Sequence, residues 1–295
     1  MLKVVGKWGH QDKVKIEWNL GKRCNYDCAY CPSSIHDNFS AHTDISILKS
    51  TVDKLSEISR PIRLSLTGGE PCVHPRIEEL LQYARSKVSF LSVTTNGTRK
   101  PLWYISQPVD QYVFSLHFEY DWLSVLETIK DVVQSDTNIH CIVHVMAHQD
   151  KMNDVKIAVG LLAQYGIEYV VRRVRWTEGD HDLFDDMKYD QTDLDWILSK
   201  TSTVKPNVII DDTLEYHAND VIKFHLNKYK GWTCNAGLES LMINWDGEVS
   251  RATCRVGGSL GNVYTGTFAI PTEPVICTRN NCTCAADIPL TKFNL

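Results

Sequence analysis

The chain has 295 residues, of which 43% are hydrophobic and 23% are charged, a composition typical of globular proteins. Its formal net charge of −5 gives no overall electrostatic basis for binding nucleic acid or an anionic membrane. No apolar run approaches the roughly 18 residues that cross a bilayer, and residues 1–12 lack the apolar core of a signal peptide, so we expect a cytoplasmic protein with no membrane segment.

Strand and helix patterns alternate along the first part of the chain. Residues 13–20 alternate between polar and apolar side chains, which predicts a strand. Residues 44–58 place apolar side chains at helical spacing, with Thr43 or Asp44 as the cap. Further strands are predicted at 61–66, 89–95, 111–118, 138–146 and 168–174. Further helices are predicted at 75–86, 121–134 and 153–165.

This regular alternation with short loops predicts parallel strands with helices outside them. Six strand–helix units are too few for a closed eight-stranded barrel. We therefore predict an α/β fold, a partial (β/α)6 TIM-like barrel of parallel strands over residues 1–176. A connecting segment is expected over 177–230, with a helix near 191–200, and a small Cys-rich α+β domain over 231–295.

The connecting segment contains an acidic stretch, made of Glu178, Asp180, Asp182, Asp185 and Asp186. A run of like charges is more typical of a solvated loop than of a binding site. The stretch could also attract a cationic substrate, an interpretation that rests on charge alone.

The ten cysteines are unevenly placed along the chain. One group lies near the N-terminus and consists of Cys24, Cys28 and Cys31. A second lies in the last fifth of the chain and consists of Cys234, Cys254, Cys277, Cys282 and Cys284. Without an export signal, clustered cysteines indicate metal ligation more than disulfide bonds. Cys72 and Cys141 stand apart, and we expect both to be buried apolar residues.

The N-terminal group has the spacing C-x3-C-x2-C and directly follows the first predicted strand. Thiolates this close in one loop can bind three corners of a cubane iron–sulfur cluster. The fourth iron then keeps an open coordination position, which a catalytic metal centre requires. A zinc knuckle is the alternative, but it needs a fourth ligand near by, and only His36 is close in sequence.

The cysteine spacing, together with Tyr30 just before the third cysteine, resembles the radical S-adenosylmethionine (SAM) superfamily. The resemblance implies a [4Fe–4S] cluster whose open iron chelates the methionine part of SAM. It further implies that an electron from the cluster cleaves SAM to a 5′-deoxyadenosyl radical, which abstracts a hydrogen atom from the substrate. An electron donor such as flavodoxin or ferredoxin would then be a partner.

A second motif, Gly68-Gly69-Glu70-Pro71, ends the second predicted strand and is similar to the GGEP motif of this superfamily. By resemblance, it binds the amino group of SAM. The residue types suit that task, because two glycines permit a close backbone approach to a ligand. Glu70 offers a carboxylate to an ammonium group, and Pro71 fixes the turn.

Polar residues also end the third and fourth predicted strands, and ligands of parallel barrels bind at such ends. The resemblance implies that these residues contact SAM or the substrate, and Ser115 is the leading candidate for SAM. Asn96 reads equally well as a turn residue. His117 and Glu119 share the face of Ser115, and a core histidine and a functional one are equally expected at 117.

The sixth predicted strand carries Arg172, Arg173 and Arg175. Charges in a barrel strand are costly unless they face a ligand or solvent. The resemblance implies an arginine against the SAM carboxylate at this place. Arg173 is our first choice for that role.

The C-terminal cysteines flank a predicted β-hairpin over 241–251, centred on Asp246-Gly247. The hairpin would bring Cys234 and Cys254 together. The region resembles a twitch domain, the short form of the SPASM domain, which holds one auxiliary [4Fe–4S] cluster. Two of Cys277, Cys282 and Cys284 would complete that site, and the remaining thiol would be inert or would donate a hydrogen atom. Structural zinc is the alternative for this region.

Three functions follow as hypotheses. The first is a radical SAM enzyme that dehydrogenates or epimerises a small polar metabolite, such as a sugar, an aminoglycoside or a nucleotide. The second is a radical SAM maturase that modifies a ribosomally made peptide. The third, of another class, is a non-catalytic iron–sulfur or zinc-binding protein.

Overall fold

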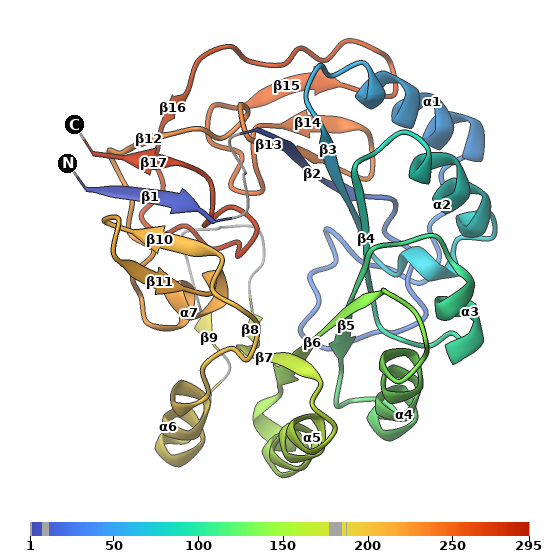
Figure 1. The fold of residues 1–295 in the computed structure, drawn as a ribbon, viewed down its shortest axis with the longest axis vertical. Coiled ribbons are helices and arrows are strands. Elements are labelled where there is room, and N and C mark those ends of the chain that lie inside the picture. Colours follow the sequence, from blue (N-terminus) through green and yellow to red (C-terminus); the bar gives the residue numbers. More distant parts are fainter. Residues whose placement is uncertain (1, 8–11, 177–184, 187, 295) are drawn as a thin grey trace.

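The computed structural model describes residues 2–7, 12–176, 185–186 and 188–294. Its centre is a curved sheet whose parallel strands neighbour one another in chain order (Figure 1). These strands are β2 (Val14–Asn19), β3 (Ile62–Thr67), β4 (Phe90–Thr95), β5 (Gln111–Leu116), β6 (His140–Ala147) and β7 (Glu168–Arg173). The predicted partial barrel of parallel strands is therefore confirmed.

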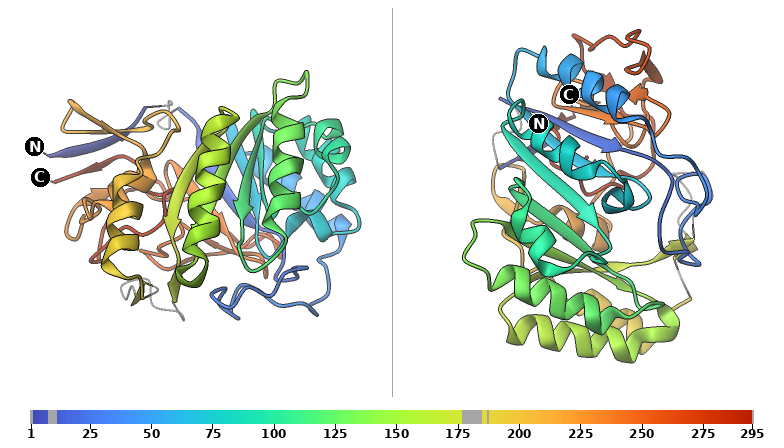
Figure 2. Two further views of the ribbon diagram at one scale, coloured as in Figure 1. Left: turned by 90° about the horizontal axis from the view of Figure 1, so that it is seen from below. Right: turned by 90° about the vertical axis from the view of Figure 1, so that its right-hand side faces the viewer.

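Helices cover the outer face of this sheet, as Figure 2 shows. They are α1 (Ile45–Ser56), α2 (Ile77–Arg85), α3 (Pro101–Ser106), α4 (Trp122–Val133) and α5 (Met152–Gln164). The side chain of Asp44 caps α1 by accepting a hydrogen bond from the Ser46 amide, and Asp121 caps α4 in the same way. Of the two predicted caps of the first helix, Asp44 is thus the one used.

The side chains of β2 show how the sheet divides its two faces. Val14, Ile16 and Trp18 are buried in the core between the sheet and the helices. Lys15 and Glu17 alternate with them and therefore point to the barrel interior. The same alternation in the other strands gives the barrel an apolar outer layer and a more polar inside.

The predicted hairpin around Asp246-Gly247 forms, but it extends the barrel sheet. Its first strand, β13 (Ser240–Ile243), pairs in parallel with β2. Its second strand, β14 (Glu248–Ser250), and then β15 (Ser259–Asn262) continue the sheet in antiparallel order. The edge of the barrel next to the cysteine loop is therefore closed by C-terminal residues.

A second, antiparallel sheet joins the two ends of the chain (Figure 1). Its strand order is β11 (Leu214–Tyr216), β10 (Val208–Ile210), β1 (Lys3–Gly6), β17 (Lys292–Phe293), β12 (Thr233–Cys234) and β16 (Val275–Ile276). This sheet draws strands from all three predicted segments, so strand pairing crosses the predicted boundaries at residues 176 and 230. The division into those segments stays a prediction.

The remaining elements are short. They are η1 (Pro71–Val73), η2 (Gln149–Lys151), β8 (Arg175–Trp176), β9 (Asp185–Asp186), α6 (Gln191–Ser199) and α7 (Ala218–Lys223). α6 is the predicted helix near 191–200. Of the acidic stretch, the backbone of Asp185 and Asp186 pairs with β8, whereas Glu178, Asp180 and Asp182 lie outside the described residues. Across the described residues, no helix is long and apolar enough to cross a membrane.

Candidate active site and a second cysteine pocket

The first cysteine group lies in the loop between β2 and α1. The Cys24 amide donates to the Asp37 carbonyl at 2.8 Å, and the Asp37 amide donates back to the Lys22 carbonyl at 3.0 Å. The Asp37 carboxylate in turn accepts a hydrogen bond from the Ser40 amide at 2.8 Å. These hydrogen bonds hold residues 22–24 against residues 37–40 of the same loop.

Of the three cysteines in this loop, Cys28 is buried and Cys24 and Cys31 are half-buried. Burial raises the pKa of Cys28 to about 12 and that of Cys31 to about 11. The charge of Cys24 adds to both effects, since the groups repel one another when ionised. Thiolates are stable in such a place only beside a compensating cation, and a metal centre supplies one. This thiol set fits the predicted cluster, and all ten cysteines of the chain are free.

The zinc-knuckle alternative would use His36 as its fourth ligand. His36 Nε2 lies 2.6 Å from the Tyr26 carbonyl and donates its proton there, so only Nδ1 of this ring keeps a lone pair. Within the part of the chain that the structure describes, no three His, Cys, Asp or Glu side chains converge as the ligands of a single ion do. Cysteines that bind different irons of a cubane do not need to converge in that way.

His117, just beyond the end of β5, contacts the cysteine loop. Its Nδ1 lies 2.6 Å from the Tyr30 hydroxyl and 3.4 Å from Cys28 Sγ. Burial lowers the pKa of His117 to about 4, so the ring is neutral and Nδ1 can accept the tyrosine proton. The sequence left open whether His117 is a core residue or a functional one. Its contacts with Tyr30 and Cys28 place it at the site.

Glu119 and Tyr120, which follow His117 in the same segment, also contact the cysteine loop. Glu119 Oε1 accepts a hydrogen bond from the Ala29 amide at 3.2 Å. The Tyr120 ring stacks on Tyr26 with centroids 3.7 Å apart, and its hydroxyl accepts from the Asp27 amide. Sequence reasoning missed Tyr120, because nothing in its local pattern indicates a partner more than ninety positions away.

The glycines of the Gly68–Pro71 motif are required by the protein backbone itself. A Cβ on Gly68 would lie 2.6 Å from the Gly21 carbonyl oxygen, and one on Gly69 would lie 2.3 Å from that of Arg23. Gly68 also has a φ of 127°, which side chains disfavour. The glycines therefore permit close approach to residues 21–23, and their predicted approach to a ligand stays a prediction.

Glu70 links the ends of two strands. Its buried carboxylate accepts hydrogen bonds from the Cys72 amide at 2.8 Å, the Thr95 hydroxyl at 2.8 Å and the Asn96 amide at 2.6 Å. Burial raises the pKa of Glu70, and these hydrogen bonds oppose that shift. A carboxylate has about four acceptor positions, so the predicted bond to an ammonium group remains possible beside these contacts.

Asn96 holds the cysteine loop through its side chain, which donates to Asn25 Oδ1 at 2.8 Å. Asn25 then donates to the Thr98 hydroxyl at 2.9 Å. Ser115 lies on the interior face of β5, opposite His144 of β6. Its hydroxyl makes no hydrogen bond with any residue that the structure describes, so it is available to a ligand.

The arginines at the end of β7 lie on opposite faces. Arg172 points inward, where its Nη1 lies 3.2 Å from His144 Nδ1 and its charge interacts with Glu17. Arg173 lies on the other face, near Lys223. Alternation along the strand therefore puts Arg172, not our first choice Arg173, inside the barrel. The side chain of Arg175 lies outside the described part.

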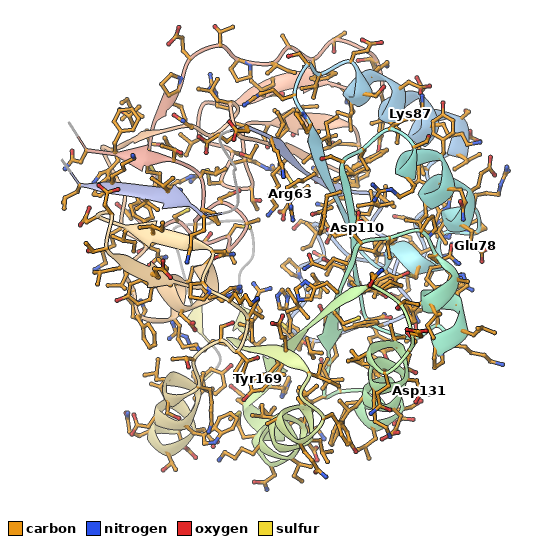
Figure 3. All side chains as sticks on the ribbon, viewed as in Figure 1. Arg63, Glu78, Lys87, Asp110, Asp131 and Tyr169 are labelled. Carbon is orange, nitrogen blue, oxygen red and sulfur yellow. The ribbon has the colours of Figure 1, made fainter. Side chains whose placement is uncertain are left out.

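The barrel interior carries ionisable groups from both ends of the chain. Lys15 Nζ lies 3.3 Å from Glu17 Oε1, and Thr253 Oγ1 lies 3.5 Å from Glu17 Oε2. Cys284 Sγ lies 4.0 Å from the same carboxylate oxygen. Figure 3 shows side chains of several strands projecting toward this centre. Such an interior suits a polar ligand better than an apolar one.

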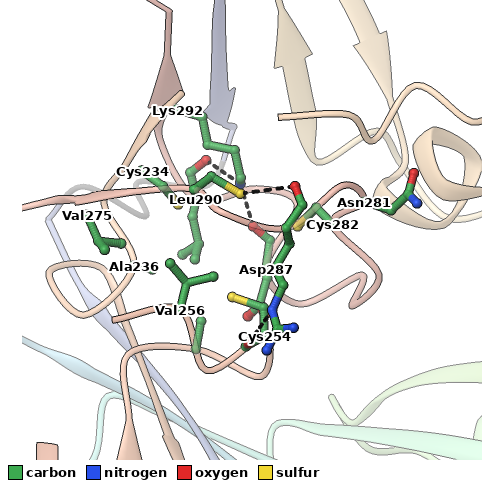
Figure 4. Close-up of a pocket in the computed structure, with 13 residues that line it drawn as sticks. Cys234, Ala236, Cys254, Val256, Val275, Asn281, Cys282, Asp287, Leu290 and Lys292 are labelled. Atoms are coloured by element: carbon green, nitrogen blue, oxygen red, sulfur yellow. Dashed lines mark hydrogen bonds between the residues drawn. The ribbon is translucent and has the colours of Figure 1, made fainter. Parts of the chain in front are cut away.

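Four of the C-terminal cysteines surround a separate hollow (Figure 4). The thiol-bearing residues that line it are Cys234, Cys254, Cys277 and Cys282. Cys284 does not line it and instead faces Glu17. The structure thus brings together the predicted pair and two of the three remaining candidates. Their role as ligands stays a prediction.

This second pocket also fits a metal cluster by its chemistry. Burial raises the pKa of Cys254 to about 12 and that of Cys282 well above its usual range. Asp287 Oδ2 lines the pocket, is buried, and makes no hydrogen bond within the described structure. Buried thiols and an unpartnered carboxylate oxygen around one hollow indicate that the pocket is built for a charged group. Cys72 and Cys141, in contrast, are buried in the apolar core as predicted.

Comparison with known proteins agrees with this geometry. The model of the Radical SAM superfamily matches residues 18–117. Fe-coproporphyrin III synthase of Methanosarcina barkeri is 33% identical over 87 residues, which is 29% of this chain and 22% of that protein. The chain therefore spans only about a fifth of the length of this relative.

Solved structures share the fold over more of the chain. The structure of anSMEcpe with bound AdoMet and the Cp18Cys peptide matches with a TM-score of 0.59 and 13% identity, over 86% of this chain and 78% of that one. Streptococcus suis SuiB bound to the precursor peptide SuiA matches with a TM-score of 0.58 and 14% identity, over 87% of this chain and 64% of that one. At such identities the likeness establishes the fold alone.

Proposed function

The chain contains a radical SAM domain, and from this premise we propose that it cleaves SAM reductively and abstracts a hydrogen atom from a small polar metabolite. The observation that carries the proposal is the loop of Cys24, Cys28 and Cys31. The loop follows β2, with Cys28 buried and Cys24 and Cys31 half-buried, and contacts from the ends of β4 and β5 hold the loop in place. When bound, a [4Fe–4S] cluster supplies the electron that cleaves SAM to a 5′-deoxyadenosyl radical.

Different residues around that loop would bind the cluster, hold the loop in place and bind SAM. Cys24, Cys28 and Cys31 would hold the cluster, while Tyr30 and His117 keep Cys28 in place through the Tyr30–His117 hydrogen bond of 2.6 Å. Glu70 would accept the SAM ammonium group, and the free hydroxyl of Ser115 would bind elsewhere on SAM.

The motif glycines and Asn96 would act by positioning. Gly68 and Gly69 let β3 approach the cysteine loop closely, Pro71 begins the η1 turn, and Asn96 ties the loop to β4. Arg172 replaces Arg173 as the arginine that would face a carboxylate, since it lies inside the barrel.

A polar substrate is supported by the charged barrel interior. Glu17, Lys15 and Arg172 present both signs of charge within this one space. Sugars, aminoglycosides and nucleotides carry hydroxyl, amino or phosphate groups that such side chains can bind. Apolar substrates would leave these groups without partners, which is costly.

Two reactions are compatible with this interior, epimerisation and dehydrogenation. Epimerisation needs a hydrogen donor, and the Cys284 thiol beside Glu17 supports that role. Dehydrogenation needs an electron acceptor, and a second cluster held by Cys234, Cys254, Cys277 and Cys282 would supply one. An epimerised product formed in D2O would carry deuterium from an exchanged thiol, whereas dehydrogenation would give an oxidised product without it.

A peptide maturase is the second candidate function. It is supported by the two structural neighbours described above, each of which holds a peptide. An interior that accepts a peptide side chain would need an open path from the surface to Glu17 and Arg172. Parallel screens of peptides and of polar metabolites would separate the two candidates.

The test is anaerobic reconstitution with iron and sulfide, followed by dithionite and SAM, with and without candidate substrates. Dithionite here replaces the flavodoxin or ferredoxin that would donate electrons in a cell. We expect 5′-deoxyadenosine to form, and deuterium from a labelled substrate to appear in it. Bound iron with no 5′-deoxyadenosine would favour the non-catalytic iron–sulfur protein instead.

A further inference from the structure

Lys292 is a buried cation at the wall of the second cysteine pocket. It lies on β17, directly opposite Cys234 of β12 in an antiparallel pair, and only 2% of it is exposed. Directly opposite residues project to the same face of a sheet. The ammonium group of Lys292 therefore lies on the same side as the Cys234 thiol, as Figure 4 shows.

The hydrogen bonds of Lys292 are satisfied, whereas the carboxylate with which its charge interacts, that of Asp287, lies beyond ion-pair distance. Its Nζ donates to the carbonyls of Asp287 at 2.6 Å, Ile288 at 3.0 Å and Leu290 at 3.0 Å. Carbonyl oxygens carry no formal charge. Lys292 also makes no ion pair with any residue that the structure describes. A buried charge is costly unless an opposite charge accompanies it.

Lys223 shows how this protein accommodates another buried lysine. It is 4% exposed and also donates to a backbone carbonyl, that of Lys200. Unlike Lys292, it has a buried carboxylate partner, Asp220, at 3.4 Å. The two lysines thus match in burial and differ in the presence of a carboxylate within ion-pair distance.

Negative charge for Lys292 is available from the pocket itself. Lys292 and the four cysteines line the same hollow, and the electrostatic partners of Lys292 are led by Cys234 and Cys282. Neutral thiols would give Lys292 no negative charge. Four thiolates on a cubane cluster leave a net negative charge, which becomes more negative on reduction.

We propose that Lys292 is the counter-ion of an auxiliary cluster in this pocket and raises the reduction potential of that cluster. The inference rests on the auxiliary cluster of the proposed function. A fixed cation stabilises the reduced, more negative form more than the oxidised form. Lys292 therefore makes the cluster a better electron acceptor without being a ligand.

The test is a redox titration followed by EPR on the reconstituted full chain and on three variants. Lys292→Gln keeps donors for the carbonyls but removes the charge, Lys292→Arg keeps the charge, and Lys223→Gln is the control for loss of a buried lysine. We expect Lys292→Gln to shift the auxiliary midpoint to a more negative potential. Lys292→Arg and Lys223→Gln should stay near the wild-type value, and the SAM-binding cluster should not move in any of them.

An unchanged auxiliary midpoint in Lys292→Gln would overturn the proposal and leave Lys292 a structural cap of the 287–290 turn. If Lys292→Gln loses the second cluster, retention of iron by Lys292→Arg supports the counter-ion role, and loss in both variants contradicts it. A wild-type protein with about four irons per chain instead of about eight would refute the auxiliary cluster itself, which is a separate failure.

Discussion

Cys282 and Cys284 are two residues apart yet face different parts of the molecule. Cys282 lines the C-terminal pocket, whereas Cys284 Sγ lies 4.0 Å from Glu17 in the barrel interior. Residues two apart would share a face in an extended strand, so these thiols diverge because the segment is not a strand and turns from residue 285 onward. A single segment thus contributes a thiol to each of the two candidate sites.

This placement predicts different losses for two matched variants. Cys282→Ser should lose about half of the bound iron, about four of eight atoms per chain, because one cluster then lacks a ligand. Cys284→Ser should keep all of it and should change the product or its deuterium content instead. Iron and sulfide analysis after reconstitution measures the difference. Equal iron loss in both variants would contradict the assignment.

His217 gives a prediction about pH. Burial lowers its pKa to about 4, and its side chain caps α7 by accepting from the Asn219 amide. The unfolded chain binds a proton near pH 6.5, so stability from this group is complete above that pH. It is lost as the pH falls toward about 4, by roughly 1–3 kcal/mol.

The matched variant is His217→Asn, which keeps a capping acceptor but cannot titrate. Its free energy of unfolding should fall less between pH 6.5 and 4.5 than that of the wild type, as measured by urea denaturation. If the free energy of unfolding fell equally with pH in both proteins, His217 would not be held neutral in the folded state.

At the scale of elements, the strand β3 and the cysteine loop meet at Gly69. A Cβ there would lie 2.3 Å from backbone oxygens of the loop, which cannot move independently of their hydrogen bonds. Gly69→Ala should therefore lower the free energy of unfolding by about 1–3 kcal/mol, as overpacking does.

Gly160 in α5 is the matched control, because a Cβ there meets nothing within 4 Å. Gly160→Ala should raise stability by about 0.5–1 kcal/mol through helix propensity. Denaturant midpoints with unchanged slopes measure both effects. A neutral Gly69→Ala would mean that the loop is not packed against this turn.

Elements with strong periodicity could be predicted from the sequence. The strands and helices of the barrel have apolar spacings that extend over several residues, as in Ile45–Ser56. Short elements such as β1 and β17 could not be predicted. Each has too few residues for a pattern, and each forms only because distant segments pair, as Lys3 does with Phe293.

The candidate site was predictable where it is local in sequence and not where it is folded together. The spacing of Cys24, Cys28 and Cys31 and the Gly68–Pro71 motif are both local. The contact of Tyr120 with the loop depends on the path of β5, and the choice of Arg172 over Arg173 depends on strand register. Neither can be read from a local pattern.

In the whole molecule, the regions that carry the two cysteine sites both adjoin the strand β2. β13 pairs with β2 and so attaches the C-terminal region directly beside the first cysteine loop. Between the two sites lie Glu17 and Cys284, in the interior where a substrate would bind.

The first cysteine loop would hold the cluster that cleaves SAM. The most direct test of this role compares wild type with Cys28→Ala after reconstitution, dithionite and SAM. Wild type should produce 5′-deoxyadenosine, and Cys28→Ala should produce none while keeping the iron of the second pocket, about four atoms per chain. Equal 5′-deoxyadenosine from both proteins, or none from an iron-loaded wild type, would contradict the account.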